Sequence, residues 1–309
     1  MRNYTRAVRR ASIVALLGLL VLAGCGSGSS SESDAHTSAA TLAVLAARAP
    51  TVLPLTAGTS DLAPGRLRFT FLVVASDGRT IDRPRASVWL ARGRDRPPFE
   101  RVTARLESVA PDAADEAFEP LQLYVAHLNV PAPGRYWLLA RPQGSRAVAL
   151  GEVVVKRRTA SPEIGARAPP SRTPTLATTG GRLAPLTTDP TPDRHLYAHS
   201  LAESLRSNAP SVVAFATPAF CASRTCGPVV DVVSQVRREL DDDRLRFIHV
   251  EVYEDNDPAN GHNRWMKEWR LESEPWVFLV GADGRIAEKF EGAVSVRELR
   301  AAVQRHLMR

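Results

Sequence analysis

Cysteine and lysine are the scarce residues in this chain of 309 residues. There are only three cysteines, and lysine occurs only at Lys156, Lys267 and Lys289 among the 40 lysine and arginine residues. The formal net charge of +7 therefore comes from arginine, and the arginines are scattered among acidic residues. Because a nucleic-acid-binding surface needs clustered basic residues, the sequence does not predict nucleic acid as a partner.

A long apolar run is missing as well. The apolar run near the N-terminus, residues 13–22, is shorter than the about 20 apolar residues that a membrane-spanning helix needs. Arginines precede this run, and the small residues Ala23 and Gly24 follow it. This order of charge, apolar core and small residues is typical of an export signal, so we expect the chain to be exported.

The export signal ends in Leu22-Ala23-Gly24-Cys25, followed by a run of glycine and serine. This stretch resembles the lipobox of bacterial lipoproteins. The resemblance implies that residues 1–24 are removed and that Cys25 carries lipid; a plain cleaved signal is the alternative. A lipid on Cys25 would hold the protein on the extracytoplasmic side of the cell membrane. The other two cysteines would then lie where disulfides persist.

Composition divides the rest of the chain. Residues 25–64 are rich in Ser, Ala, Thr, Gly and Pro and have too little apolar surface to pack, which predicts a flexible tether. Residues 158–194 contain recurring prolines, which predict an extended connector and a lead-in to the last domain. Residues 65–157 form one predicted domain between these segments, and residues 195–309 form a second.

Residues 65–157 have the pattern of a β-protein. Apolar residues occupy every second position in residues 67–73, and turn signals separate further short strands. With no strong helix, this pattern predicts an antiparallel sandwich. The segment around Tyr136 resembles the corner that opens a late strand in immunoglobulin-like domains, which implies an immunoglobulin-like β-sandwich without its intersheet disulfide. The further strands are predicted at residues 86–90, 102–106, 121–129, 135–140 and 148–156.

Residues 195–309 alternate between helix and strand patterns. Asp283-Gly284 is a strong hairpin turn signal, and Ser295 with Glu298 forms a capping box that opens the last helix. The predicted helices are residues 196–207, 228–240, 263–271 and 295–307, and the predicted strands are residues 212–217, 245–253, 276–280 and 286–290.

This element order, the cysteine loop after the strand at 212–217 and Pro275 before a hairpin strand resemble the thioredoxin fold. The resemblance covers residues 162–309 and lies near the redoxin and membrane-anchored thiol-disulfide oxidoreductase families. It implies an α/β domain with a mixed central sheet flanked by helices, with Cys221, Cys226 and Pro275 in its catalytic site. It implies neither cofactor nor metal. The implied partners are thiols and disulfides of exported proteins and a membrane or extracytoplasmic redox partner.

The spacing Cys-x-x-x-x-Cys differs from the Cys-x-x-Cys of thioredoxin. Residues five apart on a helix lie about 140° apart around its axis, too far to bridge easily within a Cα separation of about 7 Å. The connection should therefore be non-helical, with a helix beginning near Gly227. Counting from the strand end favours Cys221 as nucleophile and Cys226 as resolving thiol. Cys226-Gly227-Pro228-Val229, however, resembles Cys-Gly-Pro-Cys with Cys226 first, and a disulfide that only staples the loop is the third alternative.

Other functions stay open at this point. Thr217-Pro218 before Cys221 is similar to the motif of Q-type peroxiredoxins, but their catalytic arginine has no match here. A metal-handling protein such as a Sco-type copper chaperone needs a different cysteine spacing and a distant histidine, for which His249 and His262 are only loose candidates. We therefore expect a thiol-disulfide oxidoreductase, with a non-enzymatic binding or metal-handling lipoprotein as the main alternative.

Overall fold

The computed structural model describes residues 40–110, 121–221 and 225–308. Cys25 lies outside the described residues, so its lipidation stays a prediction. Within the described ranges, no helix is long and apolar enough to cross a bilayer. The described residues all belong to one compact unit, Ala39–Arg309.

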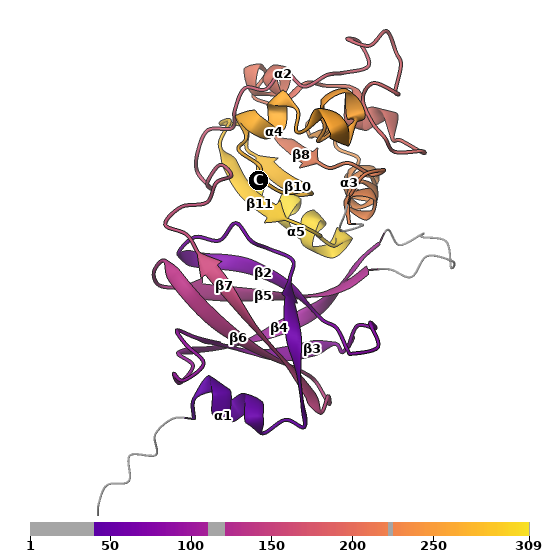
Figure 1. The fold of residues 1–309 in the computed structure, drawn as a ribbon. Coiled ribbons are helices and arrows are strands. Elements are labelled where there is room, and N and C mark those ends of the chain that lie inside the picture. Colours follow the sequence, from indigo (N-terminus) through magenta and orange to yellow (C-terminus); the bar gives the residue numbers. More distant parts are fainter. Residues whose placement is uncertain (1–39, 111–120, 222–224, 309) are drawn as a thin grey trace, which may run out of the picture. The chain divides into compact units, whose positions relative to one another are not determined.

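The first half of the described chain folds into a closed barrel of seven strands (Figure 1). The strands follow one another around the barrel in the order β1-β2-β5-β4-β3-β6-β7. All neighbouring strands are antiparallel except β7 and β1, which close the barrel with a parallel pairing. The strands are β1 (Thr51–Ala57), β2 (Gly65–Val73), β3 (Arg85–Ala91), β4 (Glu100–Val109), β5 (Leu121–Val130), β6 (Gly134–Pro142) and β7 (Ala147–Val155).

Alternating apolar residues fill the interior of this barrel. Phe71 on β2 stacks with Phe69 and with Tyr124 of β5, at ring-centroid distances of 5.9 and 5.2 Å. Gly151 on β7 permits the approach of β1, because a Cβ atom there would lie only 2.9 Å from the Cβ atom of Leu55. The predicted immunoglobulin-like sandwich is therefore wrong, since the parallel contact between β1 and β7 closes the strands into a single barrel.

Part of the segment predicted to be a tether, residues 25–64, is folded. The helix α1 (Leu42–Ala47) is capped by the side chain of Thr41. Leu42 in α1 is fully buried and packs against Val148 and other barrel residues. The strand β1 also lies in this segment. The sequence of α1, LAVLAA, is apolar, but both elements are short, and their pairing and packing against the rest of the barrel stabilise them.

The second half contains a four-stranded sheet in the order β11-β10-β8-β9 (Figure 1). The strands β8 and β9 are parallel, and the other pairs are antiparallel. The strands are β8 (Ser211–Phe215), β9 (Arg246–Val250), β10 (Trp276–Val280) and β11 (Ile286–Glu291), and the helices are α2 (Leu201–Arg206), α3 (Cys226–Leu240), α4 (Arg264–Glu268) and α5 (Val296–His306). Single turns of 3-10 helix lie at Arg194–Tyr197, Glu254–Asn256 and Pro258–Asn260.

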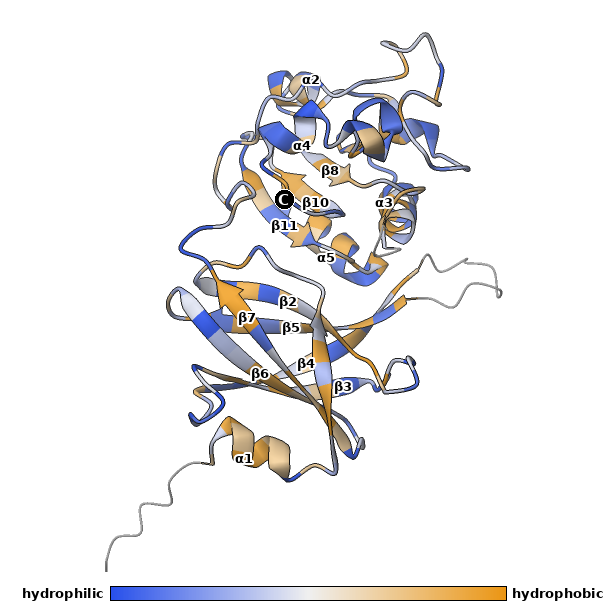
Figure 2. Cartoon of the chain, in the orientation of Figure 1, coloured by the Kyte–Doolittle hydropathy of each residue, from blue (hydrophilic) through white to orange (hydrophobic). Residues whose placement is uncertain are grey.

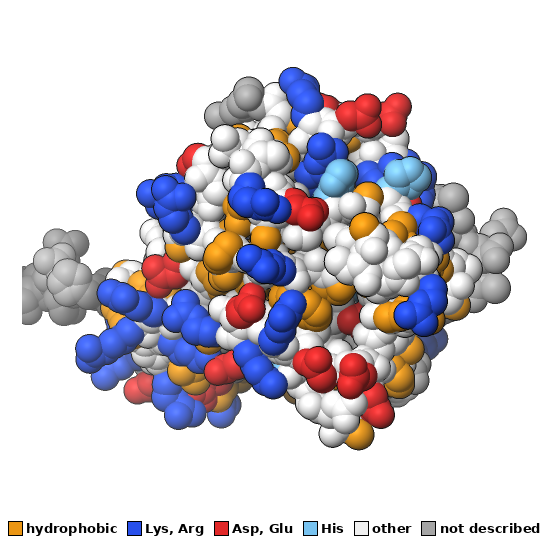
Figure 3. Space-filling view, turned by 90° about the horizontal axis from the view of Figure 1, so that it is seen from above, with side chains coloured by type: hydrophobic (Ala, Val, Ile, Leu, Met, Phe, Trp, Pro, Cys, Tyr) orange, Lys and Arg blue, Asp and Glu red, His pale blue; other side chains and the backbone are white. Residues whose placement is uncertain are grey.

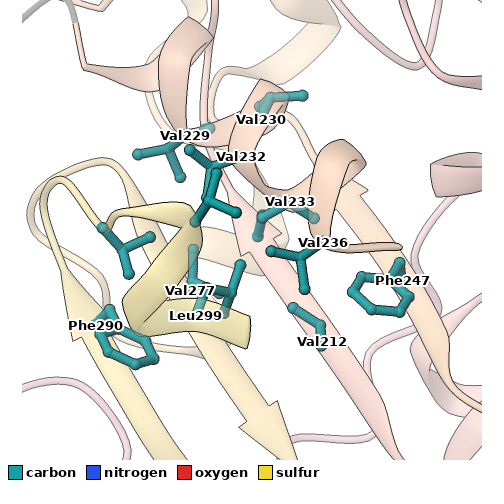
Figure 4. Packing of buried hydrophobic residues seen from close by; sticks show 14 of the residues in the cluster. Val212, Val229, Val230, Val232, Val233, Val236, Phe247, Val277, Phe290 and Leu299 are labelled. Carbon is teal, nitrogen blue, oxygen red and sulfur yellow. The ribbon is translucent and has the colours of Figure 1, made fainter. Parts of the chain in front are cut away.

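The strands of this sheet bury side chains on both faces, and Figure 2 shows that they are largely hydrophobic. On one face, Val212 and Val277 pack with the valines of α3 and with Leu299 of α5 (Figure 4). On the other face, Phe215 contacts Trp269, with ring centroids 5.1 Å apart. This core fixes the end of β8, from which the cysteine loop leaves the sheet.

The predicted fold class is wrong. The described chain is predominantly β, with a closed seven-stranded barrel and only five short α-helices, instead of a helix-flanked thioredoxin-like domain joined to a sandwich. Two predicted helices are much shorter than expected: residues 196–207 contain a single 3-10 turn and α2, and residues 263–271 contain only α4. The order of helix and strand patterns in a sequence is compatible with several folds, so the resemblance did not determine the architecture.

Two ion pairs connect the barrel with α5, and one of them is buried on both sides. Arg68 on β2 donates to both carboxylate oxygens of Glu298 on α5, each at 2.9 Å, and both side chains are nearly buried. Glu107 on β4 accepts hydrogen bonds from Arg297 and from Ser295, the N-cap of α5. Burial by itself would raise the pKa of Glu298, but the charge and hydrogen bonds of Arg68 lower this pKa below its ordinary value.

Candidate functional site

Cys221 and Cys226 are joined in a disulfide at the end of β8. Their Cα atoms lie 5.8 Å apart, within the usual range for a disulfide. Cys226 is the first residue of α3 and is fully buried, whereas Cys221 belongs to the preceding loop and is partly exposed. Cys226 is therefore out of reach of a second protein, whereas Cys221 is partly exposed.

The N-terminus of α3 lies against the sulfur of Cys221. The backbone N–H of Cys226 donates to Cys221 Sγ over 3.3 Å, and Thr225 Oγ1 lies 3.9 Å from the same sulfur. The first N–H groups of a helix have no partner inside the helix and carry its positive partial charge. Such an environment stabilises a thiolate. The local geometry therefore favours negative charge on Cys221 when the disulfide is open.

A buried histidine supports the start of the cysteine loop. His249 on β9 lies 3.0 Å through Nε2 from the carbonyl oxygen of Ala216 and 2.8 Å through Nδ1 from the hydroxyl of Tyr197. Because a carbonyl only accepts, Nε2 carries the proton, and Nδ1 accepts from the tyrosine hydroxyl. Burial raises the pKa of Tyr197 well above its ordinary value, so the hydroxyl stays a donor. His249 is thus a structural support for the loop.

The proline-rich segment supplies a second support. The N–H of Ala219 donates to Thr188 Oγ1 over 3.1 Å, and this hydroxyl donates to Glu251 Oε1 over 2.7 Å. The N–H of Thr188 also donates to Glu251 Oε1, over 2.6 Å. Glu251 is buried, and its second oxygen has no hydrogen-bond partner among the described residues. A buried carboxylate therefore holds the loop in place just ahead of Cys221.

Pro275 lies at the same edge of the sheet as the cysteine loop. Trp276, the first residue of β10, pairs with Phe215, the last residue of β8, so β10 begins where β8 ends. The Glu274–Pro275 peptide bond is cis, and Pro275 is buried. Its backbone carbonyl accepts from the N–H of Gly292 over 2.8 Å. The sheet therefore brings the third predicted site residue to the edge that carries the disulfide.

Aromatic and ionisable side chains continue from this loop toward the segment after β9. Phe220, beside Cys221, is 43% exposed, and its ring lies edge-on to Tyr253 at 6.5 Å. The ring of Tyr253 in turn lies 5.8 Å from that of His262. Partial burial raises the pKa of Glu274, and the nearby His262 acts in the opposite direction. These groups give the surface beside the disulfide a mixed apolar and acidic character.

The sequence identified the cysteines and Pro275 but missed the residues that support the loop. Tyr197, Thr188 and Glu251 are ordinary polar residues in three separate segments, and only the fold brings them behind the loop. The one available signal was Glu251, a charged residue that continues the apolar strand pattern of β9. His249 and His262 do not form a metal site with other ligands: the part of the chain that the structure describes has no cluster of three or more potential His, Cys, Asp or Glu ligands.

Figure 3 shows one face of the molecule, on which basic, acidic and apolar side chains all occur. In comparisons with known proteins, the chain matches no family model and has no detectable similarity to a curated protein. Its function therefore has to be inferred from the geometry of the site.

Proposed function

We propose that this protein is a membrane-anchored, extracytoplasmic thiol-disulfide oxidoreductase that acts on cysteines of exported proteins. One observation carries the proposal: Cys221 is partly exposed and its sulfur accepts a hydrogen bond from the first N–H group of α3, while Cys226 is fully buried. A pair in which only one sulfur can be attacked, and in which that same sulfur is stabilised as a thiolate, has the asymmetry that exchange requires.

Oxidation of a partner begins with a thiolate of that partner attacking Cys221 Sγ. The bond between Cys221 and Cys226 breaks, a mixed disulfide forms with Cys221, and Cys226 leaves as a thiolate at the start of α3. The thiolate of a second cysteine of the partner then attacks the partner sulfur of the mixed disulfide. The partner disulfide forms, and Cys221 is released as a thiolate. The partner has lost two electrons and two protons, and the pair is a dithiol that another disulfide must reoxidise.

The reverse reaction uses the same atoms. The Cys221 thiolate attacks a partner disulfide, and Cys226 then attacks Cys221 Sγ to release the reduced partner. Both directions need Cys221 and Cys226 to stay within bonding reach after the disulfide opens. The contacts from His249 to Ala216 and from Thr188 to Ala219 support this proposal, because they hold the loop independently of the disulfide.

The reduction potential of the pair tests the proposed function. We expect the disulfide of the purified protein to equilibrate with glutathione or dithiothreitol at a potential above the roughly −300 mV below which structural disulfides typically lie. The oxidised fraction can be measured by alkylating free thiols and determining the mass of the intact protein by mass spectrometry. A bridge that resists reduction at equilibrium would overturn the proposal and favour the alternative, a binding protein whose loop is stapled by a structural disulfide.

The membrane location rests on Cys25, and it has its own test. We propose that lipid on this cysteine anchors the mature protein, and the support is the lipobox-like sequence before it. The variant Cys25→Ala should therefore move from the membrane fraction to the soluble fraction when cells are fractionated. Unchanged membrane association of Cys25→Ala would contradict lipid anchoring, and it would leave the redox measurement on Cys221 and Cys226 unaffected.

A further inference from the structure

A cavity of about 560 Å³ lies between the barrel and the sheet, and we call it the arginine cavity. The strands β2, β4 and β5 line one side, and β11 and α5 line the other. Its basic side chains are Arg66, Arg68, Arg105, Arg297 and Arg305. The volume is in the range of ordinary small-molecule sites.

The charges in the arginine cavity are unbalanced. Its five arginines face three glutamates, Glu107, Glu288 and Glu298. Two of the arginines are already paired: Arg68 with Glu298 and Arg297 with Glu107. Among the described residues, no carboxylate lies within ion-pair distance of Arg66, Arg105 or Arg305, so these three form a cationic wall.

A neighbouring cavity shows that this excess is specific. The cavity around Lys289 shares Arg66 and Arg68 with the arginine cavity, but its four cationic side chains face four carboxylates. Lys289 there donates to the hydroxyls of Thr159 and Ser161 over 2.9 and 2.8 Å. The cationic and anionic side chains of the cavity around Lys289 are therefore equal in number, whereas the arginine cavity has an excess of cationic side chains.

Arg68 adds a partly compensated positive charge to the lining of the arginine cavity. Its side chain is nine-tenths buried and lines the arginine cavity. Nε and Nη2 donate to Glu298, and Nη2 also donates to the carbonyl of Ala293. Nη1 is buried and has no hydrogen-bond partner among the described residues. A buried guanidinium nitrogen without an acceptor is costly, so the positive charge of Arg68 is only partly compensated by the described residues around it.

The rest of the lining indicates the chemistry of the ligand. Val125, Phe290 and Ala302 add apolar surface, and the guanidinium of Arg68 lies over the ring of Phe290 at 5.5 Å. Guanidinium groups match the oxygen atoms of phosphate in a forked geometry. A ligand that satisfies both walls carries a phosphate group on an apolar body.

We propose that the arginine cavity binds the phosphate group of an organic phosphate, with Arg66, Arg105 and Arg305 as its cationic contacts and the wall around Phe290 as its apolar contact. The phosphate could be that of a soluble ester or that of a phospholipid headgroup. This site is separate from the disulfide, and the proposal does not depend on the redox function.

Calorimetric titration of the soluble Cys25→Ala protein with phenyl phosphate tests the proposal in phosphate-free buffer at low salt. We expect saturable binding that is tighter than for inorganic phosphate, because only the ester reaches the apolar wall. The variant Arg105→Gln/Arg305→Gln should bind at least roughly tenfold more weakly, because hydrogen bonds to charged groups are lost. Arg146→Gln is the matched control, since Arg146 is exposed and lies outside the cavity.

A second arm uses phosphatidylglycerol vesicles in place of phenyl phosphate, with the same two variants. Binding of either probe that is weakened by Arg105→Gln/Arg305→Gln and not by Arg146→Gln supports the proposal and identifies the source of the phosphate. A further readout does not depend on how the variants fold. In the protein with unaltered arginines, the bound probe should protect Arg305 from modification by phenylglyoxal, and mass spectrometry maps the modified arginines. Binding of neither probe, or binding that the double variant leaves unchanged, would overturn it.

Discussion

With Cys226 replaced by serine, the protein should form a stable mixed disulfide through Cys221, whereas Cys221→Ser should form almost none. The reason is accessibility: Cys221 is partly exposed and accepts the N–H of residue 226, while Cys226 is fully buried. We expect the Cys221 thiol to react with oxidised glutathione at least about tenfold faster than the Cys226 thiol, because buried structural cysteines are inert. The adduct can be quantified by intact mass in a Cys25→Ala background.

The two variants are matched controls for each other, because each removes the same disulfide and leaves one thiol. In denaturing urea, the two thiols should react at nearly equal rates, so a difference seen only in the folded protein reports the structure around α3. Faster reaction of Cys226 in the folded protein would reverse the assignment. It would favour the alternative in which Cys226-Gly227-Pro228 acts as the nucleophile motif.

Individual elements could be predicted from the sequence because local pattern determines them. The strand predicted at residues 276–280 is confirmed as β10, and the alternation at residues 67–73 is confirmed by the burial of Phe69, Phe71 and Val73 in the barrel. The capping box of Ser295 and Glu298 is confirmed at the start of α5. In each case the decisive residues are neighbours in the chain.

The architecture could not be predicted because distant pairings decide it. Residues 51–57 contain a proline and belong to a segment rich in Ser, Ala, Thr, Gly and Pro, which predicted a tether, yet their pairing with β7 closes the barrel. A sandwich and a barrel can use the same alternating strands, and the difference lies in which edge strands meet. The prediction of a thioredoxin-like fold class was wrong for a related reason. The order of elements specifies neither the length of the helices nor the face of the sheet against which they pack.

The candidate site was predicted only in part, for chemical reasons. Cysteine is scarce in this chain, so Cys221 and Cys226 stand out in the sequence. Thr188 and Glu251 are common residue types 63 positions apart, and no local pattern connects them, although they support the loop through Ala219. Residues whose role depends on a contact across the fold leave no signal in a single sequence.

The variant Glu298→Gln should lose about 3–5 kcal/mol of unfolding free energy, the typical cost of removing one partner of a buried ion pair. Arg68 would stay nearly buried with an uncompensated charge. Glutamine keeps the capping role at the third position of α5. The decrease in unfolding free energy therefore reports the removed carboxylate charge and not a lost cap. Urea unfolding followed by circular dichroism measures it. Asp77→Asn is the control, since Asp77 forms an exposed pair with Arg79, and its unfolding midpoint should barely change.

The same pair should also produce an acid-dependent loss of stability. The folded pKa of Glu298 is lowered by Arg68, so its contribution is fully present above the unfolded pKa of about 4.3 and is lost as pH falls through the folded pKa. Glu298→Gln should lack this component, and its stability should depend less on pH in that window. The double variant Arg68→Met/Glu298→Gln should recover most of the lost stability, because it removes the unpaired charge. If the double variant were as unstable as Glu298→Gln, the loss would come from packing at α5 and not from the buried charge of Arg68.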